Sequence, residues 1–307
     1  MWGYIVKRIA GVIPTLLIIV TLSFFLIRMA PGGPFDSERE IPPEIAANLE
    51  AVYHLDQPLW KQFGYYLMNV VQGDFGPSFK YLDYDVTELI IQGFPVSLQL
   101  GLLAIILALV IGVSFGVIAA LRQNGVIDYL IMTLAMTGIT IPNFVMAPLL
   151  ILIFAVFLGW LPAGGWGDQG DFKNMILPVI ALSFPQIATV ARMTRASLIE
   201  TMNAPYIRTA KAKGLSPMLI LGRHASRATM LPILSWLGPA TAAIITGSVV
   251  VEQIFGLPGI GRYFVNGALN RDYTLVMGVV IFYGALIILM NLLVDLLYAW
   301  LDPRIRY

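Results

Sequence analysis

The sequence predicts an all-α membrane protein with six transmembrane helices. Of its 307 residues, 58% are hydrophobic and only 12% are charged, whereas an average soluble domain is about 25% charged. A mean hydropathy of +0.80 exceeds what a soluble fold can hide in its interior. The sequence contains no cysteine, which excludes a secreted disulfide scaffold. The composition also excludes intrinsic disorder and an ordinary cytosolic enzyme.

The six helices follow from long stretches without charged residues. A transmembrane helix needs about 20 apolar residues to cross roughly 30 Å of hydrocarbon. Six uncharged stretches lie between Arg8 and Arg28, Glu88 and Arg122, Asp128 and Asp168, Lys173 and Arg192, Arg227 and Glu252, and Asp272 and Asp295. None shows the alternating polarity of outer-membrane strands, so we expect helices.

The third stretch is ambiguous, because its 39 residues, 129–167, could form one helix with a loop or a hairpin broken at Pro142-Asn143. A single crossing places both termini and 12 of the 19 basic residues on one side of the membrane. The segment from Ala30 to Phe94 on the other side then contains three basic residues against ten acidic ones. Two crossings would place the basic residues that follow outside. The positive-inside rule therefore predicts six crossings with both termini cytoplasmic.

The sequence divides into three parts. We expect an N-terminal transmembrane helix over 1–29, an extracytoplasmic helical cap over 30–94, and a five-helix core over 95–307. The core includes a basic cytoplasmic loop over 200–227. The first apolar run is long for a signal peptide and is not followed by a small-x-small cleavage pattern, so we expect it to be retained.

Proline, glycine and charge mark the elements of the cap. Residues 42–51 and 57–71 each begin near a proline and are predicted as helices. Residues 73–77, Gly-Asp-Phe-Gly-Pro, predict a turn. Asp85 with Glu88 three positions later resembles a capping box and predicts a short helix that leads to the second span.

Residues 112–116, Gly-Val-Ser-Phe-Gly, fit the G-x-S-x-G pattern of a serine nucleophile. That chemistry needs a strand-to-helix turn and an acid–base partner, but this segment lies inside a continuous apolar stretch. The two histidines, His54 and His224, are predicted outside and inside. Gly112 and Gly116 also have the G-x-x-x-G spacing that lets membrane helices approach closely. We therefore favour packing over catalysis.

Other catalytic and metal-binding patterns are missing. Residues 256–261, Gly-Leu-Pro-Gly-Ile-Gly, lack the Lys-Ser/Thr of a P-loop and follow no predicted strand, so we expect a tight turn on the outer side. No His-Glu-x-x-His motif is present. Acidic residues are scarce within the predicted spans, and Asp295 is the clearest one. Because ion-coupled carriers usually need buried ionisable groups, this scarcity disfavours such a carrier.

The loop over 200–227 predicts two short helices. Asn203-Ala204-Pro205 starts the first helix, and Lys211 lies in its last turn, where a cation suits the helix dipole. Gly214 is placed to form a left-handed cap, and Ser216-Pro217 starts the second helix. The segment is too short to span and too apolar for a free loop. It is either a basic interfacial loop or a docking element for a cytoplasmic partner.

Two sequence blocks identify the chain as a member of a known family. Residues 206–215, Tyr-Ile-Arg-Thr-Ala-Lys-Ala-Lys-Gly-Leu, followed by Arg223-His224-Ala225, resemble the cytoplasmic EAA loop of ABC importer permeases in its peptide-transporter form. Residues 252–261, Glu-Gln-Ile-Phe-Gly-Leu-Pro-Gly-Ile-Gly, resemble the signature that closes the same domain. Further similarity covers Arg8 with Pro14, residues 73–76, and the tail Asp302-Pro303-Arg304-Ile305. The chain is most similar to B-type permease subunits of the oligopeptide and dipeptide transport family.

This resemblance implies a type I ABC importer permease fold and two functional segments. The ATPase-docking loop would contain Tyr206, Arg208, Thr209, Ala210, Lys211, Gly214, Leu215, Arg223 and His224. The outer signature turn would contain Glu252, Phe255, Gly256, Pro258, Gly259 and Gly261. Arg208 stands where many permeases have Glu, and Thr209 replaces the Ala that follows, so the ATPase residue that meets Arg208 is not implied.

The resemblance further implies a subunit of the bacterial inner membrane that is not itself an enzyme. Its partners would be a homologous C-type permease, two cytoplasmic ABC ATPases, an extracytoplasmic peptide-binding protein, the peptide substrate and membrane lipid, without nucleic acid. ATP and Mg²⁺ would be bound by the ATPases, and this chain would hold no cofactor, metal or catalytic residue. Dipeptides, nickel chelates or cationic peptides are alternative substrates. An autonomous secondary carrier is the alternative of another class.

Overall fold

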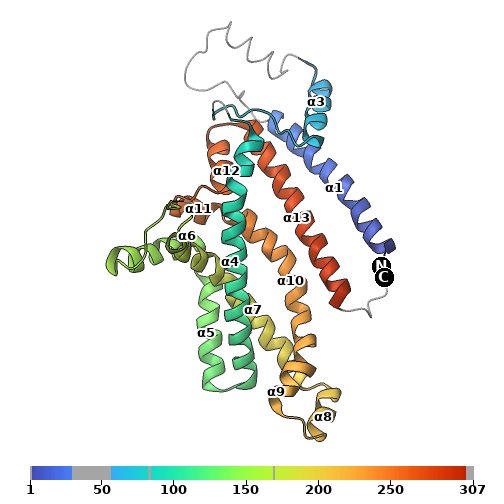
Figure 1. Ribbon diagram of the computed structural model, residues 1–307, viewed down its shortest axis with the longest axis vertical. Coiled ribbons are helices and arrows are strands. Elements are labelled where there is room, and N and C mark those ends of the chain that lie inside the picture. The colour runs from blue at the N-terminus through green and yellow to red at the C-terminus, as the bar shows by residue number, and fades with distance from the viewer. Residues whose placement is uncertain (1, 30–56, 82–83, 169, 302–307) are drawn as a thin grey trace. The chain divides into compact units, whose positions relative to one another are not determined.

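The computed structural model describes residues 2–29, 57–81, 84–168 and 170–301, which are helical apart from turns, loops and an isolated β-bridge (Figure 1). The predicted cap helix over 42–51 lies outside these residues. The chain forms two compact units. The first consists of Met1–Pro95 with Gly259–Ile288, and the second of Val96–Pro258 with Leu289–Tyr307. The three-part division expected from the sequence stays a prediction.

The first unit is built from apolar helices. Its elements are α1 (Trp2–Met29), α3 (Leu59–Val71), the first turns of α4 (Val86–Leu121), α12 (Ile260–Leu269) and most of α13 (Tyr273–Leu301). A buried cluster contains Val86, Leu89, Ile90, Ile260, Leu275 and Val279. Gly278 lets α13 approach α4 closely, because a β-carbon there would lie 2.5 Å from Cγ1 of Val86.

The segment between α3 and α4 is fastened to the start of α13. The Oγ of Ser78 donates a hydrogen bond to Oδ2 of Asp272 at 2.5 Å, and Asp272 is completely buried. Its Oδ1 accepts from the backbone N–H of Leu275 at 3.1 Å, which caps the first turn of α13. Because a buried carboxylate is costly without such partners, this arrangement fixes the turn onto the helix.

The sequence predicted most of this segment. The second cap helix is confirmed as α3, and the predicted turn contains Gly73 and Gly76 with φ of +82° and +86°. The short helix expected at Asp85 is wrong as a separate element. α4 begins at Val86 and continues through Pro95 without a break, since membrane helices tolerate proline.

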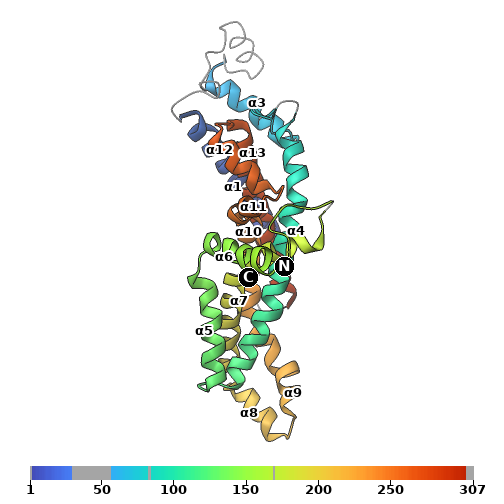
Figure 2. The same cartoon turned by 90° about the vertical axis from the view of Figure 1, so that its left-hand side faces the viewer.

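The second unit contains the remaining helices. They are the rest of α4, α5 (Val126–Thr140), α6 (Asn143–Leu150), the π-helix η1 (Ile151–Phe157), α7 (Phe172–Met202), α8 (Pro205–Ala212), α9 (Pro217–Leu219), the π-helix η2 (Ile220–Ala225), α10 (Ser226–Gly247), α11 (Val249–Phe255) and the end of α13. The main core of apolar side chains lies between α4, α6, α7, α10 and α11. Figures 1 and 2 show α8 and α9 at the same end of this unit as the turn between α4 and α5.

The G-x-x-x-G pair is where α4 meets α7. A β-carbon at Gly112 would lie 2.7 Å from Cβ of Val190, and one at Gly116 would collide with Thr194. Ser114 lies between the glycines on a continuous helix, and its Oγ donates to the carbonyl four residues earlier at 2.6 Å. The close approach of the two helices confirms the predicted packing role. The continuous helix also lacks the strand-to-helix turn that a serine nucleophile needs.

Five helical segments of the described residues are long and apolar enough to cross a membrane. They are Ala10–Met29, Val86–Leu121, Phe172–Met202, Pro217–Phe255 and Tyr273–Val294. These segments correspond to five of the six predicted stretches.

The remaining stretch is bent. α5 and the continuous pair α6–η1 meet at 105° and become a sixth candidate span if the bent pair crosses once. The bend follows from Pro142, because a proline disfavours helical backbone at the preceding residue, and Ile141 has an extended ψ of 115°. The side on which the two termini lie stays a prediction.

Candidate functional site

The predicted docking loop folds as two short helical segments joined by a left-handed glycine. α8 begins at Pro205, as the sequence predicts. Gly214 has a φ of +74°, and the N–H of Leu215 donates to the carbonyl of Ala210 at 3.3 Å, which closes the helix end. Ser216 caps α9 by accepting a hydrogen bond from the backbone three residues later at 3.4 Å. The local structure of the loop is therefore encoded in its own sequence.

One face of α8 is packed into the second unit. Ile207 is completely buried and Ala210 is 5% exposed. They form a cluster with Leu198 of α7 and with Ile220 and Ala225 of η2, against which residues of the last two turns of α4 also pack. Ala210, predicted as a docking residue, therefore points inward and anchors the loop.

The opposite face of the loop is accessible. The predicted residues that are exposed or half-exposed are Tyr206, Arg208, Thr209, Lys211, Gly214, Leu215, Arg223 and His224. Of these, Leu215 also packs against the buried cluster. Tyr206 is 48% exposed, and Met218 at the start of α9 is 80% exposed. Aromatic residues, methionine and arginine are enriched at protein interfaces. Sequence reasoning missed Met218, although its apolar side chain beside Pro217 was a signal.

The loop joins α10 through the π-helix η2, which sequence reasoning did not foresee. π-helices are rare and occur frequently at functional sites. In η2 the Nδ1 of His224 lies 3.4 Å from the carbonyl oxygen of Leu219, and Ala225 is completely buried. The loop is thus packed at both ends, next to α7 and next to α10. Both helices belong to candidate spans.

An ion pair between a buried aspartate and a partly exposed arginine joins α5 to α7, and sequence reasoning missed it. Nε and Nη2 of Arg195 donate to the two carboxylate oxygens of Asp128 at 2.6 Å and 2.7 Å. Asp128 is 1% exposed and also accepts the backbone N–H of Asn124 at 2.9 Å. A bidentate pair fixes orientation as well as distance. The ion pair therefore fixes the turn between α4 and α5 onto the helix that leads into the docking loop.

The outer signature turn is divided between the units. Glu252, Phe255, Gly256 and Pro258 belong to the second unit, and Gly259 and Gly261 belong to the first. Gly256 has a φ of +64°, and the N–H of Leu257 donates to the carbonyl of Glu252 at 2.8 Å. This geometry is a Schellman cap of α11. The predicted tight turn is confirmed here.

The carboxyl group of Glu252 is completely buried in the second unit. Its Oε1 accepts a hydrogen bond from Oγ of Ser97 on α4 at 2.7 Å and another from Oγ of Ser248, between α10 and α11. A buried carboxyl group in a membrane protein needs such donors. Glu252 therefore connects α4 to the junction between α10 and α11.

Backbone and side-chain hydrogen bonds connect the end of α11 to the start of α7 through Gly164 and Gly165. The N–H of Gly165 donates to the carbonyl of Phe255 at 2.7 Å. Nδ2 of Asn174 donates to the carbonyls of Gly164 and Gly165 at 2.9 Å and 3.1 Å. A β-carbon at Gly164 would collide with the carbonyl oxygen of Phe255, so this close approach requires glycine.

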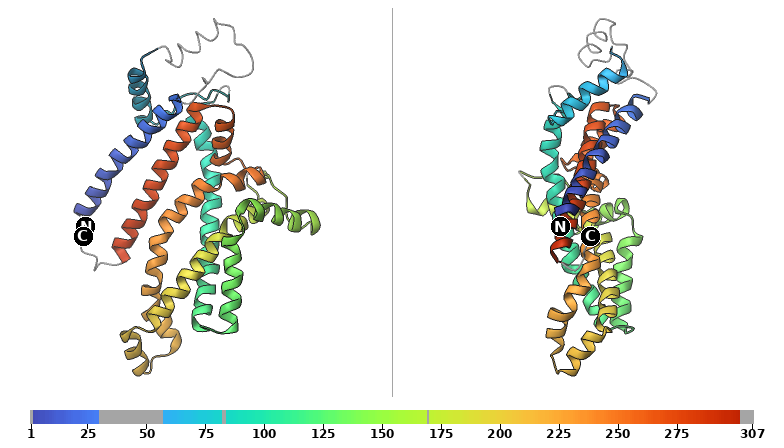
Figure 3. Two further views of the ribbon diagram at one scale, coloured as in Figure 1. Left: turned by 180° about the vertical axis from the view of Figure 1, so that it is seen from behind. Right: turned by 90° about the vertical axis from the view of Figure 1, so that its right-hand side faces the viewer.

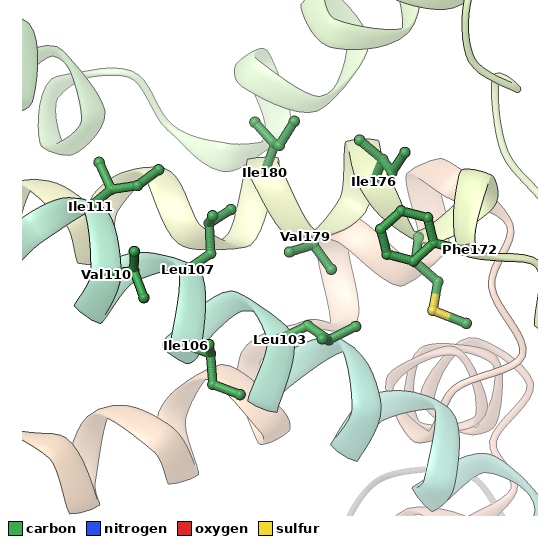
Figure 4. Close-up of a pocket in the computed structure, with 10 residues that line it drawn as sticks. Leu103, Ile106, Leu107, Val110, Ile111, Phe172, Ile176, Val179 and Ile180 are labelled. Carbon is green, nitrogen blue, oxygen red and sulfur yellow. The ribbon is translucent and has the colours of Figure 1, made fainter.

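An apolar groove of about 560 Å³ lies between α4 and α7 of the second unit (Figure 4). It is lined by Leu103, Ile106, Leu107, Val110, Ile111, Phe172, Met175, Ile176, Val179 and Ile180. Because no lining side chain is polar or charged, the groove suits apolar surface rather than a peptide's charged termini.

Comparison with known proteins gives a match over almost the whole sequence. Residues 112–307 match the family described as "Binding-protein-dependent transport system inner membrane component", and residues 1–101 match the N-terminal family of the same membrane components. The chain is 55% identical over 307 residues to the oligopeptide transport system permease protein OppB of Haemophilus influenzae, with 100% of each chain covered. It is 56% identical to OppB of Escherichia coli K12, again with 100% of each covered.

More distant similarities extend the comparison. The dipeptide transport system permease protein DppB of Bacillus subtilis is 47% identical over 306 residues, with 100% of this chain and 98% of the relative covered. Among solved structures, an inward-facing MetNI methionine ABC transporter has a TM-score of 0.59 at 16% identity, covering 70% of this chain and 97% of that one. At this identity the structural match supports the fold alone.

Proposed function

The chain belongs to the family of binding-protein-dependent transport system inner membrane components, and we propose that it is the permease subunit of an ATP-driven oligopeptide importer, forming half of the translocation pathway. Full-length identities of 55% and 56% to OppB proteins support oligopeptides as the substrate. The five or six candidate spans agree with a multi-pass protein of the bacterial inner membrane. Dipeptides are the second candidate substrate, favoured by the 47% identity to a DppB protein.

The observation that carries this proposal is the two-sided docking loop. Ile207 and Ala210 hold α8 onto the second unit, whereas Tyr206, Arg208 and Met218 are exposed on α8 and α9. A loop that is rigidly seated on one side and accessible on the other suits the transfer of a mechanical displacement from a partner.

The proposed partners of the loop are two cytoplasmic ABC ATPases, which bind ATP and Mg²⁺. A homologous C-type permease would complete the pathway, and an extracytoplasmic binding protein would deliver the peptide. The termini and the docking loop would then lie in the cytoplasm, as the basic residues of the loop favour. No hydrolytic step is assigned to this chain.

Coupling would proceed through the two ends of the loop. When the ATPases close on ATP, α8 moves, and its buried cluster passes the displacement to α7 and α10. ATP can shift the permease between inward- and outward-facing states only because it binds those states with different affinity. Peptide enters the pathway in one state and leaves to the cytoplasm in the other.

Truncating one exposed side chain tests the docking role. We expect Arg208→Ala to reduce copurification of the ATPases and peptide uptake by about tenfold, because truncating an interface arginine often costs more than about 1 kcal/mol of binding free energy. The measurement is pull-down of the detergent-solubilised transporter together with uptake in cells. Arg208 is exposed on α8, so the amount of inserted permease should not change.

Lys173→Ala provides the matched control. Lys173 is an exposed basic residue at the start of α7, whereas the docking loop follows the end of that helix. This variant should retain both the ATPases and uptake. Wild-type copurification in Arg208→Ala would contradict docking through this face of α8.

A further inference from the structure

We propose that α3 is an interfacial anchor, whose exposed face lies in the headgroup region of the lipid leaflet at the C-terminal end of α1. Under the proposed topology this is the outer leaflet. The inference requires only that α1 crosses the membrane, and it is independent of the substrate and of the ATPases.

The first observation is how α3 is attached to the end of a span. The ring of Phe24, which is completely buried, lies 5.3 Å from the ring of Phe63 and 5.7 Å from that of Tyr66 on α3. Nε of Arg28 donates to Oε1 of Gln62 at 2.9 Å. These contacts hold α3 beside the last turns of α1 (Figure 3), where a membrane-spanning helix leaves the hydrocarbon.

The second observation is the opposite face of α3. Helical periodicity places Trp60, Tyr65, Met68 and Val71 on one side of the helix. They are 69%, 51%, 65% and 80% exposed, respectively. Tryptophan and tyrosine are enriched at the membrane–water interface, because their rings combine an apolar body with a polar tip. α3 therefore has an exposed apolar face in addition to the face that packs against α1.

The third observation is charge. Residues 30–94 contain ten acidic side chains, but α3 contains none. Its one charged residue is Lys61, whose Nζ lies 5.5 Å from the centre of the Trp60 ring. The aromatic residues and the lack of carboxylates suit a helix in the plane of the interface, and the flexible side chain of Lys61 can place its ammonium group among the headgroups.

The fourth observation is continuity with lipid-facing surface. Leu22, Leu26 and Met29 of α1 are 54%, 64% and 78% exposed on a candidate span, which makes them accessible to lipid. Phe25 is 36% exposed, and its ring lies 5.6 Å from that of Phe63. The apolar surface thus continues from the span onto α3, and the bilayer is the occupant that this continuity favours.

The natural sequence is suited to a direct test because it contains no cysteine. We would attach a nitroxide to Met68→Cys and separately to Val71→Cys. The complete transporter, with cysteine-free companion subunits and retained uptake, would be reconstituted in phosphatidylethanolamine–phosphatidylglycerol vesicles. Collisions with oxygen, which concentrates in the bilayer, and with a water-soluble nickel chelate then report depth. Leu22→Cys gives the hydrocarbon reference, and Asp74→Cys in the adjacent turn gives the aqueous one.

We expect the oxygen-to-nickel collision ratio at both α3 sites to be at least about threefold above that at Asp74→Cys, in line with burial of the apolar face by several ångströms. A ratio equal to that at Asp74→Cys would overturn the proposal, because it would place the face in water. Protection from both reagents would also overturn it, because a protein segment would then cover α3.

Discussion

At the scale of single residues, the ion pair between Asp128 and Arg195 joins α5 to α7. Asp128 is buried, and its carboxylate is held by two hydrogen bonds from Arg195 and one from the backbone of Asn124. Replacing both members of such a pair by apolar side chains is often tolerated, and the Arg195 side chain, which is 28% exposed, can still reach solvent when Asp128 is lost. The pair is therefore expected to orient α5 against α7 more than to add net stability.

We expect Asp128→Leu to destabilise the second unit by about 2 kcal/mol, because Arg195, whose side chain is 28% exposed, loses two charge-assisted hydrogen bonds. The double variant Asp128→Leu with Arg195→Met should recover most of this loss. The measurement is the apparent melting temperature of the detergent-solubilised protein, followed by peptide uptake. Equal melting temperatures for the single variant and the wild type would contradict a structural role for the pair.

At the scale of elements, the docking loop depends on a reversal of backbone direction at Gly214. Its φ of +74° is a conformation that a β-branched residue adopts only with strain of about 1–3 kcal/mol. Nothing lies within 4 Å of a β-carbon built there, so strain and not collision is the expected effect.

We therefore expect Gly214→Val to reduce peptide uptake at least several-fold, because α8 and α9 can no longer keep their relative position. The amount of permease in the membrane should be unchanged. Gly222→Val is the matched control, since Gly222 lies in the same loop, has equally open space and does not have a positive φ. Uptake by Gly214→Val at the level of Gly222→Val would show that this conformation is not required.

The elements were predictable where the signal was local. Apolar length located the spans, Pro205 and Gly214 located the ends of the loop helix, and the spacing of Gly112 and Gly116 predicted close packing. Each of these features depends on residues within one continuous segment of the chain. The possible break at Pro142 was likewise visible, and the distribution of basic residues favoured one crossing over two.

The remaining features depend on residues that are distant in sequence. Asp128 and Arg195 are 67 positions apart, and Ser97 and Glu252 are 155 apart, so no local pattern joins them. The π-helices η1 and η2 have no period that the sequence displays. The exposure of Met218 is similarly decided by which face of the loop is packed.

At the scale of the whole molecule, the described residues combine five or six candidate membrane spans with the proposed docking loop. The family membership and the full-length identity to OppB proteins place it among membrane components of binding-protein-dependent transport. Its buried carboxyl groups at Asp128, Glu252 and Asp272 are all hydrogen-bonded within their own unit. These hydrogen bonds indicate a structural role for the three carboxyl groups rather than a role in ion coupling.

The most direct test is peptide uptake into proteoliposomes that contain either the purified chain alone or the complete transporter. The account predicts that the chain alone accumulates no oligopeptide, even with a proton or sodium gradient, and that the complete transporter accumulates it only with ATP and the binding protein. Uphill accumulation by the chain alone would contradict the account, because the isolated subunit would then be a secondary carrier.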